Sequence, residues 1–261
     1  HHLHNGWSMD YQGLPPVDVF IACEPEAAVT ALLAALGDGK SRPVAANRHD
    51  LPAPAGDKLT VDHMATALHD AIKGRETSLA HVSLSWNGAS IPFRHPLDYL
   101  GSDGGGGVGG GPGITVGAAL ALKGSGRMVI GVCGDGDFLM GVTAIWTAVH
   151  YRIPLLIVVA NNRSFFNDEL HQERVARMRS RPVENRWVGQ RISEPDIDIA
   201  AMARAQGAQS FGPVDALGDL PAVLKKAVAT VDAGHVAVVD VRVEPGYTAA
   251  TTVAMTRAKG E

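Results

Sequence analysis

Cysteine, excess basic charge and long apolar runs are scarce or absent in this 261-residue sequence, and each scarcity excludes a class of protein. The two cysteines, Cys23 and Cys133, lie far apart and belong to no CxxC or His/Cys ligand pattern, which argues against a disulfide framework and a zinc finger. The formal net charge is −4, whereas a general nucleic-acid binder carries a basic face or stripe. No apolar run reaches the ~18 to 20 residues of a membrane-spanning helix, so we expect a soluble chain.

The composition suits folded globular protein, because 46% of the residues are hydrophobic and 19% are charged. That is enough material for one large α/β domain or two small ones. Residues 1–11 lack the charged-then-apolar pattern of a signal peptide, so we expect a cytoplasmic protein. The sequence begins with His1 and not with Met, and we expect it to be a piece of a longer chain.

The chain divides into a short first part and a long second part. Residues 1–37 hold one β-type run and one helical pattern, which is too little for a domain. Residues 38–57 are rich in Gly, Pro, Arg and Asn and are predicted to be a linker. The second domain is expected over residues 58–247, with residues 248–261 as a C-terminal tail.

Strand-like and helix-like segments alternate through the second part, which predicts a three-layer α/β/α fold around a doubly wound, mostly parallel sheet. The segment 155–160 is entirely apolar, as in strands that a parallel sheet buries on both faces. The glycine cluster at 101–113 is expected to form neither helix nor strand. The expected strands are 17–23, 79–85, 128–132, 155–160 and 236–243, and the expected helices include 25–36, 61–72, 114–122 and 138–150.

Capping residues predict further helix boundaries. Thr60 is a plausible cap for the helix that starts at residue 61. Asp196 or a neighbour can cap a helix that ends at Gly207, and Asp219 can cap another that ends at Gly234.

A Gly-Asp-Gly motif at 134–136 and an Asn pair at 161–162 each follow a predicted strand, with 24 residues between them. The carboxyl ends of parallel strands meet at one edge of a sheet, where ligands bind. Carboxylate and amide oxygens suit a hard cation such as Mg²⁺, which uses few protein ligands together with water and substrate phosphates. Asp135 and Asn162 therefore form a candidate magnesium site.

The same motif suits a phosphate group. Gly136 would allow the backbone to come close to a ligand, and a helix from Phe138 would present its free N–H groups and positive end to an anion. Together with the candidate cation site, this arrangement predicts a metal-bridged diphosphate.

These motifs resemble those of a known family, the thiamine diphosphate (ThDP)-dependent enzymes of the acetolactate synthase, benzoylformate decarboxylase and pyruvate decarboxylase group. The shared stretch is GDGDFLMGVTAIWTAVHYRIPLLIVVANN, and the resemblance extends over about residues 17–247. A second Gly-Asp-Gly at 37–39 has no Asn pair at the matching distance, so the spacing carries the resemblance.

The resemblance implies a role for each motif residue. Mg²⁺ would be held by Asp135, Asn162 and the backbone carbonyl of Ser164, and the N–H groups of Asp137 and Phe138 would bind the diphosphate. In the stretch GGGGVGGGPGITVG, the bulky apolar residue that bends the cofactor aligns with Val108, and the Gly106 carbonyl would accept from its 4′-amino group. The implied cofactor contacts are thus Gly106, Val108, Gly134, Asp135, Gly136, Asp137, Phe138, Asn162 and Ser164.

One expected residue is missing from the pattern. The glutamate that activates the cofactor in this family lies on a separate pyrimidine-binding domain, and no Glu of this sequence has a matching context. Residues 1–37 resemble the end of the family's middle domain, so the pyrimidine-binding domain is expected from another chain or a missing segment, in a homodimer or tetramer. FAD cannot be judged, because its contacts lie in that mostly missing middle domain.

The family's chemistry is non-oxidative cleavage or formation of a C–C bond on a 2-keto acid. Decarboxylase, acetolactate synthase-like carboligase and 2-hydroxyacyl-CoA lyase remain open. A diphosphate-binding module without catalysis is an alternative from another class. The second alternative is an NAD-dependent dehydrogenase, because Gly104, Gly106 and Gly109 satisfy the dinucleotide-binding pattern GxGxxG. That fingerprint needs a buried strand directly before the first glycine, whereas residues 92–101 are polar and interrupted by proline.

Three further features have plainer interpretations. Cys133 is expected to be a small core residue, because its neighbours are apolar. The arginine-rich segment 163–191 is expected to be a solvated face or a subunit contact rather than a binding site for carboxylates or phosphates. His95 precedes the glycine cluster and is expected to be structural rather than a substrate contact.

Overall fold

The computed structural model divides the chain into two compact units, residues 1–48 and 49–261. In the first unit, helix α1 (Pro25–Leu36) has proline in its first turn and ends at Gly37, whose N–H donates to the Leu33 carbonyl at 3.2 Å. No described residue of this unit is buried. The residues described are 18–19, 21, 23–37, 54–88, 90–101 and 107–246.

Several sequence predictions therefore cannot be compared with the structure. Only residues 18–19, 21 and 23 of the expected strand 17–23 are described, and none of them is in a strand. Most of the expected linker, the expected tail 248–261 and Gly106 lie outside the described residues.

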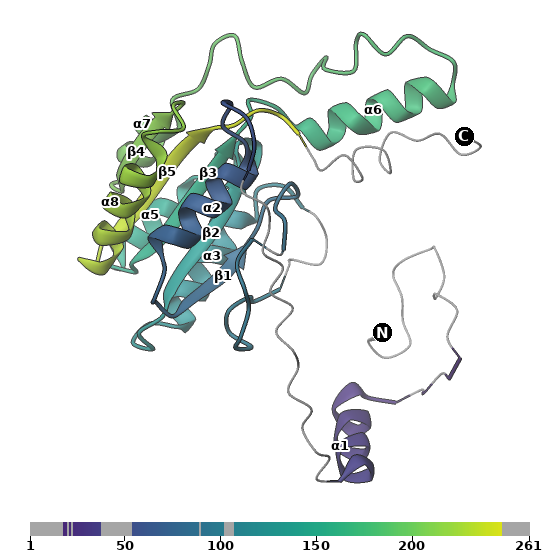
Figure 1. Cartoon of the computed structure of the whole chain (residues 1–261), viewed down its shortest axis with the longest axis vertical. Coiled ribbons are helices and arrows are strands. Elements are labelled where there is room, and N and C mark those ends of the chain that lie inside the picture. Colours follow the sequence, from purple (N-terminus) through teal and green to yellow (C-terminus); the bar gives the residue numbers. More distant parts are fainter. Residues whose placement is uncertain are drawn as a thin grey trace. The chain divides into compact units, whose positions relative to one another are not determined.

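The second unit contains a sheet of five parallel strands in the order β1-β2-β3-β5-β4. Helices separate successive strands along the chain, as a parallel sheet requires (Figure 1). The strands are β1 (Thr77–His81), β2 (Met128–Gly134), β3 (Leu155–Asn161), β4 (Gln209–Val214) and β5 (Val236–Arg242). The helices are α2 (Val61–Ala71), α3 (Gly111–Ala121), α4 (Asp135–Gly141), α5 (Thr143–His150), α6 (Phe166–Met178), α7 (Ile199–Ala205) and α8 (Leu220–Asp232).

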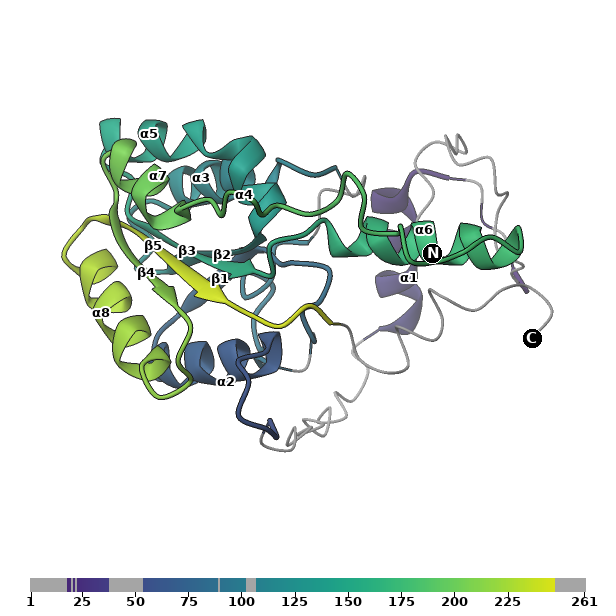
Figure 2. The same ribbon diagram turned by 90° about the horizontal axis from the view of Figure 1, so that it is seen from above.

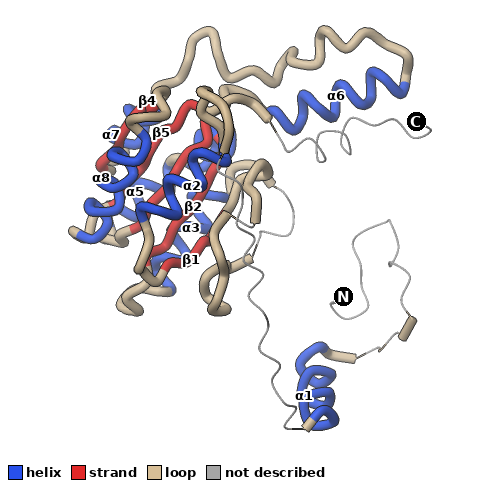
Figure 3. Tube along the Cα trace, in the orientation of Figure 1, coloured by secondary structure: helices blue, strands red, loops and turns tan. Residues whose placement is uncertain are grey.

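Helices cover both faces of this sheet, which confirms the predicted three-layer α/β/α fold. Helices α3, α4, α5 and α7 lie on one face, and α2 and α8 lie on the other (Figures 2 and 3). Two apolar clusters fill the spaces between the layers. Every residue of β3 is buried, because this strand is central and covered on both sides. None of the helices in the described part of the chain is long and apolar enough to cross a membrane.

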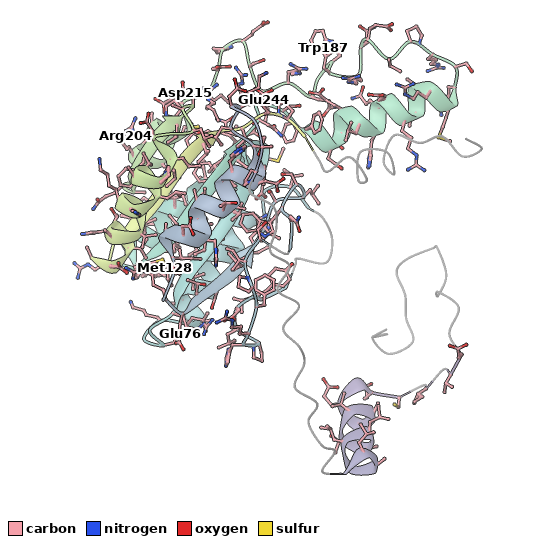
Figure 4. All side chains as sticks on the ribbon, viewed as in Figure 1. Glu76, Met128, Trp187, Arg204, Asp215 and Glu244 are labelled. Carbon is pink, nitrogen blue, oxygen red and sulfur yellow. The ribbon has the colours of Figure 1, made fainter. Side chains whose placement is uncertain are left out.

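The register of the strands brings the predicted site to one edge of the sheet. Gly134 at the end of β2 pairs with Ala160 of β3, and Asn161 of β3 pairs with Arg242 of β5. Figure 4 shows Glu76 and Met128 at the amino-terminal edge, whereas Glu244 follows β5 at the opposite edge. The segments after β2, β3 and β5 therefore begin side by side.

Three predicted boundaries are wrong. Strand β1 ends at His81 and not at residue 85, because the chain turns at Ser83, whose carbonyl accepts from the Trp86 N–H. The glycine cluster does enter a helix, because α3 begins at Gly111, with a proline in its first turn. The helix predicted from Phe138 begins three residues earlier, at Asp135, so the motif at 134–136 itself opens the helix.

The segment predicted as one helix over 138–150 is divided at Val142 into α4 and α5. Strand β4 was not predicted, because Gly212 and Pro213 interrupt its β pattern, and these residues are tolerated at the sheet edge that β4 occupies.

The capping predictions are largely confirmed. The Thr60 side chain accepts from the N–H of His63 at 3.4 Å, and Asp198, a neighbour of Asp196, caps α7 by accepting from Ala201 at 2.7 Å. Asp219 occupies the N-cap position of α8, but its side chain makes no capping bond.

Close packing between β2 and α3 leads to a stability prediction. A Cβ at Gly131 would lie 2.2 Å from Oγ1 of the fully buried Thr115, whereas a Cβ at Gly134 would meet no atom within 4 Å. We expect Gly131→Ala to lower the free energy of unfolding by about 1–3 kcal/mol through overpacking. Thermal denaturation would show this as a melting temperature lower by ~2–4 °C per kcal/mol.

Gly134→Ala is the matched control for this change in the same strand, and Gly131→Ala with Thr115→Ala tests the clash directly, since removing the hydroxyl should recover part of the loss. Equal melting temperatures for the two single variants would contradict the packing argument.

Candidate cofactor-binding site

Asp135 connects the ends of β2 and β3. The residue is only 2% exposed and is the first residue of α4. Its Oδ1 accepts from the N–H of Gly136 at 2.8 Å, and its Oδ2 accepts from the N–H of Ser164 at 3.0 Å. The Oδ1 of Asn162 accepts from that same Ser164 N–H at 2.9 Å. The two predicted ligand side chains therefore converge on one backbone group.

The two adjacent asparagines have different partners. Asn161 is buried, its Oδ1 accepts from the Arg163 N–H at 3.2 Å, and its Nδ2 donates to Oδ1 of Asp240 on β5 at 2.9 Å. Asn162 is partly exposed and bonds to Ser164. Arg163 adopts φ +58°, a conformation that is uncommon outside glycine and that tightens the turn. Two successive side-chain-to-backbone turns therefore shape the segment that carries the predicted third ligand.

Ser164 is also held by α6 and by the segment that follows this helix. Its Oγ donates to Oε1 of the buried Glu169, which accepts from Nε of Arg191 at 3.0 Å. The N–H of Phe165 donates to the Gln190 carbonyl at 2.9 Å. These bonds fix the backbone of Ser164, whose carbonyl is the predicted metal ligand.

Gly136 has a packing role that the motif alone does not reveal. A Cβ at this position would lie 2.2 Å from Cε1 of Phe165, so the aromatic ring occupies the space a side chain would need. The turn after β3 can therefore rest directly on the first turn of α4. Phe138 is fully buried, backbone included, in the apolar cluster on this face of the sheet.

The donor set at this edge fits a hard cation. Asp135, Asn162 and the Ser164 carbonyl supply only oxygen atoms, as Mg²⁺ prefers. Each of the two side chains already accepts from a backbone N–H, and each oxygen keeps a second lone pair for a cation. Burial raises the pKa of Asp135 to about 6, although the N–H groups of Gly136 and Ser164 act against it. A cation beside this carboxylate would offset the cost of burying its charge.

The glycine segment is attached to α4 through Asp137. Val108 is 49% exposed, and the next residue donates its N–H to Oδ1 of Asp137 at 2.7 Å. The N–H of Gly111 donates to the same oxygen at 3.2 Å. The prediction gave Asp137 a role through its backbone only, and its side-chain contacts are an addition from the structure.

Asp137 also belongs to a cluster with His81 and Cys133, whose ligand-type atoms all lie within 4.8 Å of one another. Burial alone would raise the pKa of Asp137, but the contact with His81 Nε2 at 3.1 Å and the two glycine N–H groups outweigh burial and lower it. Burial, with the Asp137 charge, raises the pKa of the Cys133 thiol well above its ordinary range. Cys133 is fully buried, as predicted, and a Cβ at Gly111 would lie 2.9 Å from its Sγ.

Asn161, Asp240 and Glu169 are site residues that the sequence prediction missed. Asp240 carried a recognisable signal, because it is a single carboxylate within the apolar run VAVVDVRV. Asn161 was recognised only as half of a pair. Glu169 had no such signal, since its burial depends on Ser164 and Arg191, which lie elsewhere in the chain.

The remaining candidates have structural partners. His95 belongs to a turn in which its Nδ1 accepts from the Leu97 N–H at 3.1 Å. In the arginine-rich segment, Glu173 pairs with Arg177 and Arg186, each at 2.8 Å. Figure 4 shows Trp187 on this segment, outside the three layers. These contacts agree with the plainer interpretations of both features.

The GxGxxG alternative lacks its structural context. Strand β1 ends at His81, and the described residues between it and the glycine cluster contain no further strand, only an isolated bridge from Tyr99 to Leu79. A dinucleotide-binding fingerprint requires a strand directly before the first glycine.

The buried Asp240 leads to a pH prediction. Burial raises its pKa, which the Asn161 amide and the Arg242 guanidinium offset only in part, and Oδ2 has no hydrogen-bond partner among the described residues. The folded state then holds this proton more tightly than the unfolded chain, so stability falls as pH rises from the ordinary aspartate pKa through the raised one. Asp240→Asn removes the charge and keeps the oxygen that accepts from Asn161.

We therefore measure the difference in melting temperature between Asp240→Asn and the unmodified protein at two pH values. We expect this difference to be at least ~2 °C more favourable to the variant at pH 8 than at pH 4.5. The exposed Asp62→Asn controls for loss of one negative charge. A difference that is the same at both pH values would contradict the assignment.

Comparisons with known proteins agree with this geometry. Residues 83–241 match the family described as thiamine pyrophosphate enzyme, C-terminal TPP binding domain. Over 101 residues, 39% of this chain and 18% of the relative, the sequence is 37% identical to benzoylformate decarboxylase of Pseudomonas aeruginosa.

Two solved structures are also similar. The thiamine diphosphate-dependent 4-hydroxybenzoylformate decarboxylase of Rhodococcus jostii RHA1 has a TM-score of 0.60 and 25% identity, over 75% of this chain and 34% of that one. Benzoylformate decarboxylase of Polynucleobacter necessarius has a TM-score of 0.59 and 23% identity, over 74% and 36%, and this likeness concerns the fold alone.

The chain thus spans only a minor part of the length of each relative. The family match, by contrast, covers more than half of the chain and includes both motifs of the site. The chain belongs to the family of thiamine pyrophosphate enzymes, as their C-terminal TPP-binding domain.

Proposed function

We propose that this chain binds thiamine diphosphate through Mg²⁺ at the carboxyl edge of the sheet. Asp135, Asn162 and the Ser164 carbonyl would hold the metal, and the N–H groups of Asp137 and Phe138 would bind the diphosphate. The observation that carries the proposal is the Ser164 N–H shared by Asp135 and Asn162 at 3.0 and 2.9 Å, since it brings two oxygen ligands from adjacent strands together.

The glycine segment would hold the other part of the cofactor. Val108 is proposed to support the thiazolium, and its half-exposed side chain leaves apolar surface for that contact. The Gly106 carbonyl is proposed to accept from the 4′-amino group. Gly136 completes the site by letting the turns after β2 and β3 pack closely, as the Phe165 ring on it illustrates, and Gly134 is proposed as a backbone contact of the cofactor.

For the complete protein, we propose a non-oxidative reaction on a 2-keto acid. The bound cofactor supplies the chemistry for cleaving or forming a C–C bond next to a carbonyl. This chain's residues would anchor and orient the cofactor. The names of the relatives favour decarboxylation over acetolactate synthase-like carboligation and over a 2-hydroxyacyl-CoA lyase reaction.

The proposed enzyme needs a second component. The activating glutamate is expected on a pyrimidine-binding domain, from another chain or from a segment beyond this sequence, in a homodimer or tetramer. The small share of each relative that the chain covers supports this part of the proposal.

Titration calorimetry of the chain with ThDP and MgCl₂ tests the proposed site. We expect Asp135→Ala and Asn162→Ala each to lower Mg²⁺-dependent ThDP affinity by at least about tenfold, because each removes an oxygen ligand or its support. EDTA should abolish binding by the unmodified protein.

Asp62→Ala is the matched control, since it removes an exposed carboxylate from the first turn of another helix, α2. Melting temperatures separate loss of a ligand from loss of the fold. Undiminished affinity in Asp135→Ala would overturn the assignment.

A further inference from the structure

We infer that the Asp137 side chain is a positioning residue that fixes the turn carrying Val108. The inference rests on the proposed cofactor site and adds to it a role for the Asp137 side chain, of which that site uses only the backbone. It starts from the two N–H groups of Gly109 and Gly111, which both donate to Oδ1 of Asp137, at 2.7 and 3.2 Å. The first of these bonds lies directly after Val108 in the chain.

The turn is pressed against α4 as well as bonded to it. Gly109 has φ +101°, which favours glycine, and a Cβ there would lie 2.9 Å from Cβ of Met140. A Cβ at Gly141 would lie 2.5 Å from the Gly109 carbonyl oxygen. The turn and helix α4 therefore meet through backbone, and the Asp137 carboxylate is the polar group that joins them.

The carboxylate is itself held in place. Its Oδ2 lies 3.1 Å from Nε2 of His81, at the end of β1, and its side chain is 12% exposed. A Cβ at Gly111 would lie 2.1 Å from that Oδ2 and 2.8 Å from the His81 ring, so these side chains occupy the space that a side chain at Gly111 would need. Oδ1 accepts both bonds from the turn, whereas the buried Oδ2 lies against His81 and has no hydrogen bond from the described residues.

The side chains of Asp135 and Asp137 leave α4 in nearly opposite directions. On an α-helix, residues two apart point about 200° away from each other. Asp135 accordingly reaches the turn after β3, whereas Asp137 reaches the glycine turn. One short helix thus sets the position of Val108 relative to the proposed metal ligands.

The test measures cofactor affinity and backbone protection separately. We expect Asp137→Ala to weaken Mg²⁺-ThDP binding by about tenfold and to change Mg²⁺-pyrophosphate binding by less than about twofold, because in the proposed site Val108 contacts the thiazolium and not the diphosphate. Asp137→Asn should stay within about threefold of the unmodified protein, since its Oδ1 accepts the same two bonds.

Val108→Ala provides a double-variant cycle. If Asp137 acts through Val108, adding Asp137→Ala to Val108→Ala should cost less than about threefold further in ThDP affinity. Additive losses, or equal losses of ThDP and pyrophosphate binding, would overturn the positioning role.

Amide hydrogen exchange on the cofactor-free chain tests the restraint itself. We expect the Gly109 and Gly111 amides to exchange at least about tenfold faster in Asp137→Ala than in the unmodified protein. In Asp137→Asn and in the control Asp62→Ala, both amides should exchange at the unmodified rate. The β3 amides should exchange at the unmodified rate in all three variants. Unchanged exchange in Asp137→Ala would overturn the inference. If the unmodified protein binds neither probe, the proposed function fails and the cofactor role with it, while the exchange data still decide whether Asp137 fixes the turn.

Discussion

The bond from the Ser164 N–H to Asp135 is the interaction on which the site depends, because it joins the segments that leave two neighbouring strands. It forms only where parallel register places Gly134 beside Ala160, so that both strands end at the same level. Strand β3, apolar over residues 155–160 and buried from end to end, supplies the apolar surface that holds the neighbouring strands and helices together. The Asp135 carboxylate is only 2% exposed, and its burial raises its pKa to about 6. The apolar contacts between the layers stabilise the fold against the cost of burying this group.

Much of this arrangement could be predicted from the sequence, for a physical reason. A strand, a crossover helix and a parallel strand have nearly fixed geometry, so a carboxylate and an amide that follow successive strands must meet at one edge. The asparagine pair illustrates the limit of such reasoning. Spacing identifies the pair, but only the contact with Asp240 distinguishes the buried Asn161, which shapes the turn, from the partly exposed Asn162.

What sequence reasoning missed depends on contacts between distant segments. Close approach of a ligand at Gly136 stays a prediction, and the structure adds a packing role, because the ring of Phe165, 29 positions away, occupies the space of the absent side chain. The start of α4 was placed three residues late, because Gly and Asp are poor helix formers and long-range bonds from Ser164 and Gly109 support that first turn. Strand β4 was missed because its edge position tolerates Gly212 and Pro213.

The position of α4 explains why so short a helix carries two acidic residues in one turn. Separate supports for the turn after β3 and for the glycine turn would let the proposed metal ligands and Val108 move independently. With both attached to α4, through Asp135 on one side and Asp137 on the other, any displacement of the helix moves the two together. The proposed cofactor would contact both segments at once, and such a shared support would keep the two contacts at a fixed distance from each other. The acidic pair thus carries a geometric constraint in addition to its charge.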